Sequence, residues 1–150
     1  MKEILLVEDS DADAQATQYA LKSVGIANPL RRFVNGAEAM AHLNHAEKIS
    51  AITPALPSVL LVDIKLPGMS GFEILEAIQH RPAFAKILRI VFSHLDDTNS
   101  IKRAYRSGAH SFLTKPVRQA ELSELITAFP GYWSLLGNLE KVPQQFSRAL

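Results

Sequence analysis

Cysteine is absent from the 150-residue sequence, which excludes disulfide bonds, zinc sites built on thiolates and thiol nucleophiles. An excess of one charge is also missing, because 16 basic side chains nearly balance 15 acidic ones. That balance favours neither nucleic-acid binding nor an acidic disordered chain. The first apolar run, Ile4–Val7, meets Glu8 and Asp9 at once and is too short for a signal peptide or a membrane span. We therefore expect a cytoplasmic protein without nucleic-acid or membrane partners.

Short apolar runs alternate with helical patterns along the chain. The runs predict strands at Ile4–Val7, Leu30–Val34, Val59–Val62, Ile87–Phe92 and Ser111–Thr114. Five strands alternating with five helices predict an α/β fold with a parallel sheet, right-handed crossovers and helices on both faces. We expect this domain over residues 1–130, followed by a carboxyl-terminal extension over 131–150, with no room for a second, output domain.

Two segments carry more specific structural expectations. The first helix is expected over Ala12–Val24, with Asp11 or Asp13 as its N-cap and Tyr19 among its periodic apolar residues. The segment Asn44–Ser58 lacks clear periodicity and contains two prolines, so it predicts a long surface connection.

Asp63 stands directly after the third predicted strand. Pro67, Gly68 and Gly71 then break the chain before Phe72 begins a helical pattern. The carboxylate is therefore expected at the carboxyl end of a buried parallel strand, where open α/β sheets bind their ligands.

Other strands deliver polar side chains to the same edge: Glu8 and Asp9 follow the first strand, Ser93 the fourth and Lys115 the fifth. Carboxylates packed this closely repel one another, which raises the pKa of at least one of them or requires a cation. Mg²⁺ satisfies them and leaves positions for phosphoryl oxygens. Lys115 would pair with Asp63 in the absence of a phosphoryl group and with a phosphoryl oxygen in its presence.

Over residues 3–129 the chain resembles the receiver domains of response regulators in two-component signalling. The resemblance rests on Val7-Glu8-Asp9, Gly36-x-Glu38-Ala39, Asp63-x-x-Leu66-Pro67-x-x-Ser70-Gly71, Ser93 and Gly108-Ala109-x-x-Phe112-Leu113-x-Lys115-Pro116. It implies a flavodoxin-like, doubly wound (βα)5 fold with strand order 2-1-3-4-5.

The resemblance also implies a phosphoacceptor signalling protein rather than an enzyme, with at most self-phosphorylation and self-dephosphorylation chemistry. Asp63 would accept a phosphoryl group from a histidine kinase, and Ser93 and Lys115 would contact that group. The implied Mg²⁺ ligands are the carboxylates of Glu8, Asp9 and Asp63 and the backbone carbonyl of Lys65. Phosphoryl transfer needs mainly positioning and charge neutralisation, which these groups supply.

Phe112 is the implied aromatic switch residue. Movement of the Ser93 hydroxyl toward the phosphoryl group would leave space that Phe112 fills, which changes the face formed by helix four, strand five and helix five. Phe112 lacks the hydroxyl of the commoner tyrosine. The Lys115-Pro116 bond resembles the family's cis peptide.

A closer resemblance is to the single-domain regulators that accompany bacterial phytochrome kinases. It rests on the long Asn44–Ser58 connection, Gly131-Tyr132-Trp133-Ser134-Leu135 and Pro143. It implies a homodimer through the helix-four to helix-five face, with Tyr132 and Trp133 at the interface. Trp133 and the apolar Leu139 are equally able to pack on their own domain.

Two alternatives remain open. Val7-Glu8-Asp9-Ser10-Asp11 also resembles the Asp-x-Asp motif of haloacid-dehalogenase phosphatases, in which Asp9 would be the nucleophile, although this leaves the Asp63 turn unused. The other alternative is an adaptor that is never phosphorylated. The complete set of acids, hydroxyl and lysine argues against an adaptor.

His94 stands where receivers usually carry a small residue, so it is expected to restrict access of water or donor to Asp63. We predict that His94→Ala speeds the gain or the loss of the phosphoryl group. Both rates are measured by mass spectrometry after addition and removal of a small acyl-phosphate donor. If neither rate changes, His94 does not restrict access.

Overall fold

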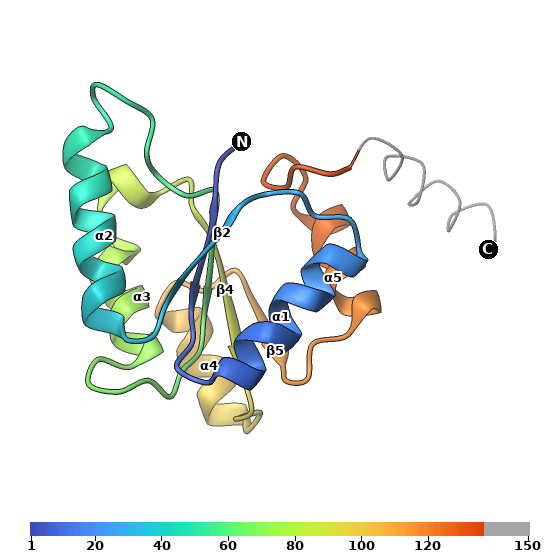
Figure 1. Ribbon diagram of the computed structural model, residues 1–150. Helices are drawn as coiled ribbons and strands as arrows, with labels where there is room; N and C mark the ends of the chain where they lie inside the picture. The colour runs from blue at the N-terminus through green and yellow to red at the C-terminus, as the bar shows by residue number, and fades with distance from the viewer. Residues whose placement is uncertain (137–150) are drawn as a thin grey trace.

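Five parallel strands form one sheet in the order β2-β1-β3-β4-β5 in the computed structural model, which describes residues 1–136 (Figure 1). The strands are β1 (Ile4–Val7), β2 (Leu30–Phe33), β3 (Val59–Val62), β4 (Leu88–Ser93) and β5 (Ser111–Thr114). Each neighbouring pair is parallel. The predicted flavodoxin-like α/β fold and its strand order are confirmed.

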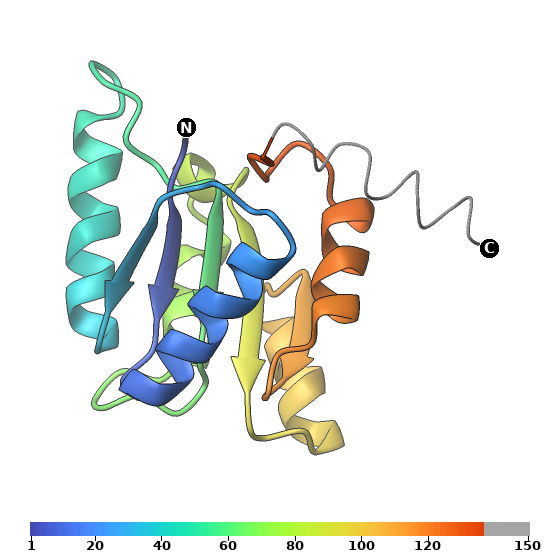
Figure 2. The same ribbon diagram turned by 45° about the vertical axis from the view of Figure 1, so that its right-hand side comes forward.

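Helices cover both faces of the sheet (Figure 2). They are α1 (Asp11–Ser23), α2 (Gly36–Ile49), α3 (Gly71–Gln79), α4 (Thr98–Arg106) and α5 (Gln119–Ala128), with a short 3-10 helix at Pro82–Phe84. α1 and α5 pack on one face, and α2, α3 and α4 pack on the other. Within residues 1–136, no helix combines the length and apolar character needed to cross a membrane.

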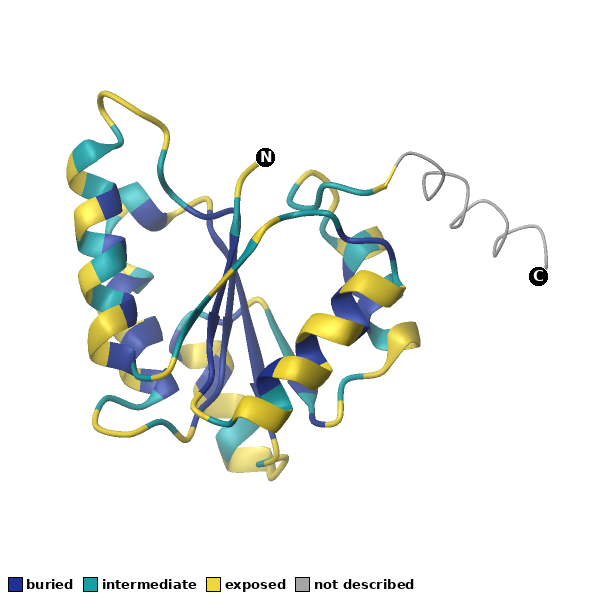
Figure 3. Cartoon of the chain, viewed as in Figure 1, coloured by how far each residue is buried: buried dark blue, intermediate teal, exposed yellow. Residues whose placement is uncertain are grey.

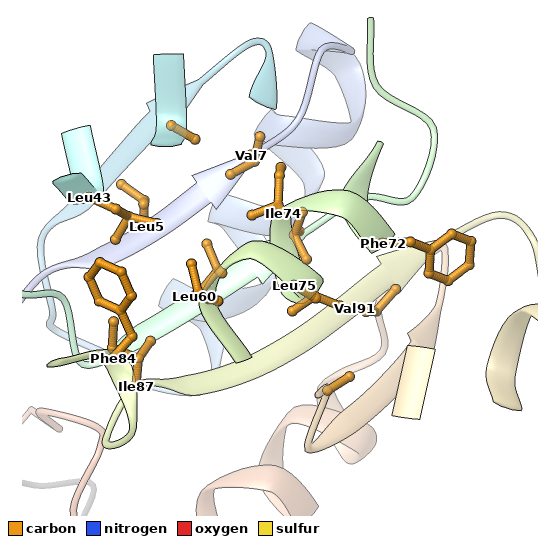
Figure 4. Close-up of a cluster of buried hydrophobic side chains, with 14 of the residues drawn as sticks. Leu5, Val7, Leu43, Leu60, Phe72, Ile74, Leu75, Phe84, Ile87 and Val91 are labelled. Carbon is orange, nitrogen blue, oxygen red and sulfur yellow. The ribbon is translucent and has the colours of Figure 1, made fainter. Parts of the chain in front are cut away.

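The three inner strands of the sheet are buried along their whole length, as the dark blue strands in Figure 3 show. Alternate side chains of a strand point to opposite faces. Leu5 and Val7 therefore join the core beneath α2 and α3 (Figure 4), whereas Ile4 and Leu6 join the core beneath α1 and α5. Burial of each such side chain contributes roughly 1.5–3 kcal/mol, so the sheet is a stable base for the groups at its ends.

The start of α1 differs from the sequence prediction. Ser10, rather than Asp11 or Asp13, is the N-cap, and its Oγ accepts a hydrogen bond from the backbone N–H of Asp13 at 3.2 Å. The short serine side chain reaches this N–H directly, while the two acids of the first turn favour the helix dipole. The position predicted for Tyr19 is also wrong, because its side chain is exposed and Leu21 is buried instead.

The long connection predicted at Asn44–Ser58 is shorter in the structure. α2 continues to Ile49, so only residues 50–58 are irregular. The helix continues because Leu43 and Ala46, one turn apart, are both buried, and its remaining residues include good helix formers. The apolar residues after Asn44 show only weak helical periodicity, so the sequence did not predict this continuation of the helix.

Residues 131–136 return across the loop between α1 and β2. Leu135 pairs with Ile26 in an antiparallel bridge. The apolar side chains that pack on the core beneath α1 and α5 include those of Tyr132, Trp133 and Leu135. These contacts lie within one chain. Leu139 and Pro143 lie outside the described residues.

The turn after β3 depends on a close backbone approach at Gly71. Its N–H donates to the carbonyl of Ile64 at 2.9 Å, and Ser70 caps α3. A Cβ atom on Gly71 would lie 2.2 Å from the backbone oxygen of Asp63. Glycine therefore allows α3 to begin directly against the strand end that carries Asp63.

We predict that Gly71→Ala lowers the free energy of unfolding by roughly 3 kcal/mol, because the added methyl group displaces the backbone of Asp63. The matched control is Gly68→Ala in the same turn. Gly68 has φ +72°, and a Cβ atom added there would meet no other atom within 4 Å, so only backbone strain of about 1 kcal/mol is expected. Urea unfolding measures both, and equal losses would contradict the steric explanation.

Candidate phosphoryl-acceptor and metal site

The candidate site lies at the carboxyl ends of the strands, at the lower edge of the sheet in Figure 2. Val7 of β1 is in register with Val62 of β3, so the next residues along these strands, Glu8 and Asp63, lie side by side. Ser93 of β4 is likewise paired with Thr114 of β5, which places Lys115 next to it along the edge. Sheet register alone thus brings together groups far apart in the sequence.

The Lys115 ammonium group is at the centre of this site. Its Nζ donates hydrogen bonds to Asp63 Oδ2 at 2.9 Å, to Asp13 Oδ2 at 3.0 Å and to Glu8 Oε1. The side chains of Lys115, Glu8 and Asp63 are each less than a tenth exposed. The pairing of Lys115 with Asp63 follows the sequence prediction, and the bond to Asp13 is an addition to it.

Burial and charge act against each other in this cluster. Burial raises the pKa of Glu8, and the nearby Asp63 adds to that effect, although Lys115 opposes both. Burial alone would lower the pKa of Lys115, but the hydrogen bonds to Glu8, Asp63 and Asp13 outweigh it and raise the pKa. Lys115 therefore stays charged and neutralises part of the acidic cluster.

Glu8, Asp9 and Asp63 form a group suited to a hard metal ion. One carboxylate oxygen from each lies within 4.8 Å of the others. Any three ligands of an octahedral Mg²⁺ ion, at about 2.1 Å from it, include at least two cis pairs about 3 Å apart, so the three carboxylates would draw closer together on binding the ion. Asp9 is exposed and offers its carboxylate to solvent, whereas Glu8 already accepts from Lys115 and from the Ser10 N–H at 3.3 Å. The donor set fits Mg²⁺.

Lys65 lies near Asp9 along a groove that the β3–α3 turn forms with Leu95 and Arg103. The role of its backbone carbonyl as a metal ligand stays a prediction.

The other residues expected at the site are placed as follows. Ser93 is buried, and its Oγ accepts a hydrogen bond from the Leu95 N–H at 3.1 Å. Phe112 is half-buried against the core beneath α3 and α4. The Lys115-Pro116 peptide is cis, as the resemblance implied. The switching roles of Ser93 and Phe112 stay predictions.

Two functional candidates were not predicted from the sequence. Asp13 was considered only as a cap, but its carboxylate reaches Lys115 and lies 3.1 Å from His94 Nε2. The sequence feature that could have indicated this role is the position of Asp13 in the first turn of α1. Side chains there tilt back toward the helix start and the end of β1. Arg32 donates through Nε to the Glu8 carbonyl at 2.9 Å and through a terminal nitrogen to Asp11.

The doubly wound sheet, the acidic edge and the buried lysine define a flavodoxin-like α/β protein of the receiver class. The sequence of residues 4–127 matches the response regulator receiver domain family. The chain belongs to this family.

Individual relatives make the resemblance more specific. Response regulator Rcp1 of Synechocystis sp. is 29% identical over 132 residues, which are 88% of each protein. The Mn²⁺-bound Rcp1 structure has a TM-score of 0.69 and covers 91% of this chain and 100% of that one. The bacteriophytochrome response regulator AtBRR has a TM-score of 0.76 at 28% identity, over 91% of this chain and 98% of its own. The phosphorylated cyanobacterial phytochrome response regulator RcpA has a TM-score of 0.69 at 27% identity, over 88% and 93%. The predicted resemblance to phytochrome-associated regulators is confirmed.

We predict that Lys115→Met lowers the free energy of unfolding without Mg²⁺ by roughly 3 kcal/mol, because it leaves buried carboxylates without their cation. Mg²⁺ should then stabilise the variant more than the wild type, since Lys115 no longer competes for the same carboxylates. Urea unfolding with and without Mg²⁺ measures both effects. Lys65→Met removes an exposed charge nearby and is the control. An equal Mg²⁺ effect in all three proteins would contradict this account.

Proposed function

We propose that this chain is a response regulator that accepts a phosphoryl group on Asp63 from a histidine kinase, with Mg²⁺ at Glu8, Asp9 and Asp63. The observation that carries the proposal is the buried contact of Lys115 with Glu8 and Asp63 beside an exposed third carboxylate. A lysine between two carboxylates is suited to move to a phosphoryl group that arrives there. The Mn²⁺-bound and phosphorylated relatives support the same chemistry.

Each residue has a definable task in the transfer. An Asp63 carboxylate oxygen attacks the phosphorus atom of a phosphohistidine, and an acyl phosphate forms as the P–N bond breaks. Lys115 and the Ser93 hydroxyl would donate hydrogen bonds to the phosphoryl oxygens. A Mg²⁺ ion held by Glu8, Asp9 and Asp63 would supply further positive charge to these oxygens. Burial of Asp63 keeps bulk water away from these interactions.

The output would be a change in packing at the edge strand β5. If Ser93 turns toward the phosphoryl group, it gives up the Leu95 N–H that it now accepts from, and the β4–α4 loop is free to move. Phe112 is half-buried beside this loop and can turn inward. The face formed by α4, β5 and α5 would then differ between the two states.

This face is also the proposed homodimer surface. The last turn of α4 carries the basic residue Arg106, while Glu121 and Glu124 of α5 line a cavity of about 380 Å³ beside Phe112. Opposite charges on adjoining helices suit a two-fold contact between copies of the chain. A phytochrome-type histidine kinase is the proposed phosphoryl donor, in line with the relatives.

Tyr132 and Trp133 remain proposed interface residues. Both already pack in part on the core beneath α1 and α5. Their contribution to a dimer would therefore come from the surface left exposed. This makes the α4–β5–α5 face the principal contact in the proposal.

We predict that incubation with Mg²⁺ and acetyl phosphate adds one phosphoryl group to the wild type and none to Asp63→Asn. Mass mapping locates the modified residue, and sedimentation records the oligomeric state before and after. Asp9→Asn should retain Asp63 as the acceptor but react slowly, because it loses a metal ligand. A phosphoryl group mapped to Asp9 would favour the phosphatase alternative, and an unmodified wild type would favour the adaptor.

A further inference from the structure

Asp13 connects three separate parts of the chain at the entrance to the site. One oxygen of its carboxylate, Oδ2, accepts a hydrogen bond from Lys115 Nζ at 3.0 Å and lies 3.1 Å from His94 Nε2. Asp13 belongs to the first turn of α1, His94 to the loop after β4, and Lys115 to the loop after β5. A single carboxylate thus joins the three segments that surround Asp63.

The side chains of this cluster divide into a buried pair and a more exposed pair. Asp63 is 9% exposed and Lys115 4%, whereas Asp13 is 27% and His94 65% exposed. Asp13 and His94 therefore lie on the solvent side of the buried pair. A donor that approaches Asp63 along this side meets them first.

The hydrogen-bonding capacity of Lys115 is fully used. An ammonium group has three donors, and the three go to Glu8, Asp63 and Asp13. A phosphoryl oxygen that binds Lys115 must displace one of these carboxylates. Glu8 and Asp63 are buried beside the metal position, and Asp13 is the most exposed of the three, so Asp13 is the partner that can leave for solvent at least cost.

The charge of Asp13 adds to this competition. Burial raises its pKa, but hydrogen bonds from Lys115 and His94 outweigh burial, and the pKa is lowered. Asp13 thus remains a carboxylate at neutral pH. A negative charge at the entrance also repels a phosphorylated donor.

We propose that Asp13 is a positioning residue that holds Lys115 and His94 across the entrance to Asp63, and that this latch of Asp13, His94 and Lys115 slows phosphoryl gain. The inference rests on the proposed function of Asp63 as the phosphoacceptor. When Asp13 gives up these contacts, one N–H of Lys115 becomes available to the phosphoryl group and the His94 side chain is no longer held in place. The latch therefore lowers the rate of phosphoryl gain, which the metal ligands raise.

The first test is Asp13→Asn, which keeps the size of the side chain and removes its charge. We expect Mg²⁺-dependent phosphorylation by acetyl phosphate to become about fivefold faster, the effect of about 1 kcal/mol in the activation free energy. Asp13→Glu, which keeps the carboxylate, should restore most of the wild-type rate. The matched control is Asp11→Asn, which removes an equal charge from the same turn. The Asp11 carboxylate pairs with Arg32 and does not contact Lys115. The rate of Asp11→Asn should stay close to that of the wild type.

The second test is a double-mutant cycle between Asp13 and His94. If His94 covers Asp63 only because Asp13 holds it, His94→Ala should speed phosphorylation in the wild type but add nothing in the Asp13→Asn background. If the rate increases caused by the two single substitutions multiply in the double variant, the two residues act independently and the latch is overturned. Thermal unfolding of every variant shows whether it is folded, and Asp13→Ser replaces Asp13→Asn if the latter is not.

The possible outcomes distinguish failure of the latch from failure of the proposed function, phosphorylation of Asp63. A wild type that is not phosphorylated on Asp63 overturns both. If the wild type is phosphorylated on Asp63 but Asp13→Asn reacts no faster than the wild type, only the latch is overturned. Equal acceleration by Asp13→Asn and Asp11→Asn would also overturn the latch, because it would show a general effect of charge.

Discussion

The interaction on which this structure depends is the contact of one buried ammonium group with carboxylates from three segments. Without Lys115, Glu8 and Asp63 would be buried side by side as like charges, an arrangement that costs several kcal/mol. With it, the acidic edge is stable but only partly neutralised, because three carboxylates contact the one lysine and a fourth, that of Asp9, lies beside Glu8 and Asp63. The remaining negative charge is what makes the edge a suitable metal site.

The fold creates this cluster through sheet register. β1 and β3 end at the same level and β5 ends two residues further along, so residues that are 52 and 107 positions apart become neighbours. Gly71 lets the backbone return against Asp63, which fixes the direction in which the turn leaves the sheet. The two apolar cores then hold the strands in place. Stability is concentrated in the sheet, whereas the ionic contacts at its edge can exchange partners. This division suits a protein with two functional states.

Much of this could be predicted from the sequence, because buried parallel strands are continuous apolar runs and the Asp63 turn has strong breakers. The group of Glu8, Asp9, Asp63 and Lys115 followed from the rule that parallel strands share an edge. The end of α2 and the N-cap at Ser10 were not predicted, since helix ends depend on tertiary packing and on small local contacts. Asp13 was missed because its partners, His94 and Lys115, are distant in the sequence and nothing in local spacing connects them.

The central claim is that Lys115 exchanges one carboxylate partner, Asp13, for a phosphoryl group while the acids at the strand ends take a metal ion. The most direct measurement is a crystal structure with Mg²⁺ and beryllofluoride, which mimics the acyl phosphate on Asp63. The account predicts a metal ion at Glu8, Asp9 and Asp63 and a hydrogen bond from Lys115 Nζ to fluoride, with Asp13 released. A structure in which Lys115 keeps all its carboxylate contacts, or in which the metal ion binds elsewhere, would contradict it.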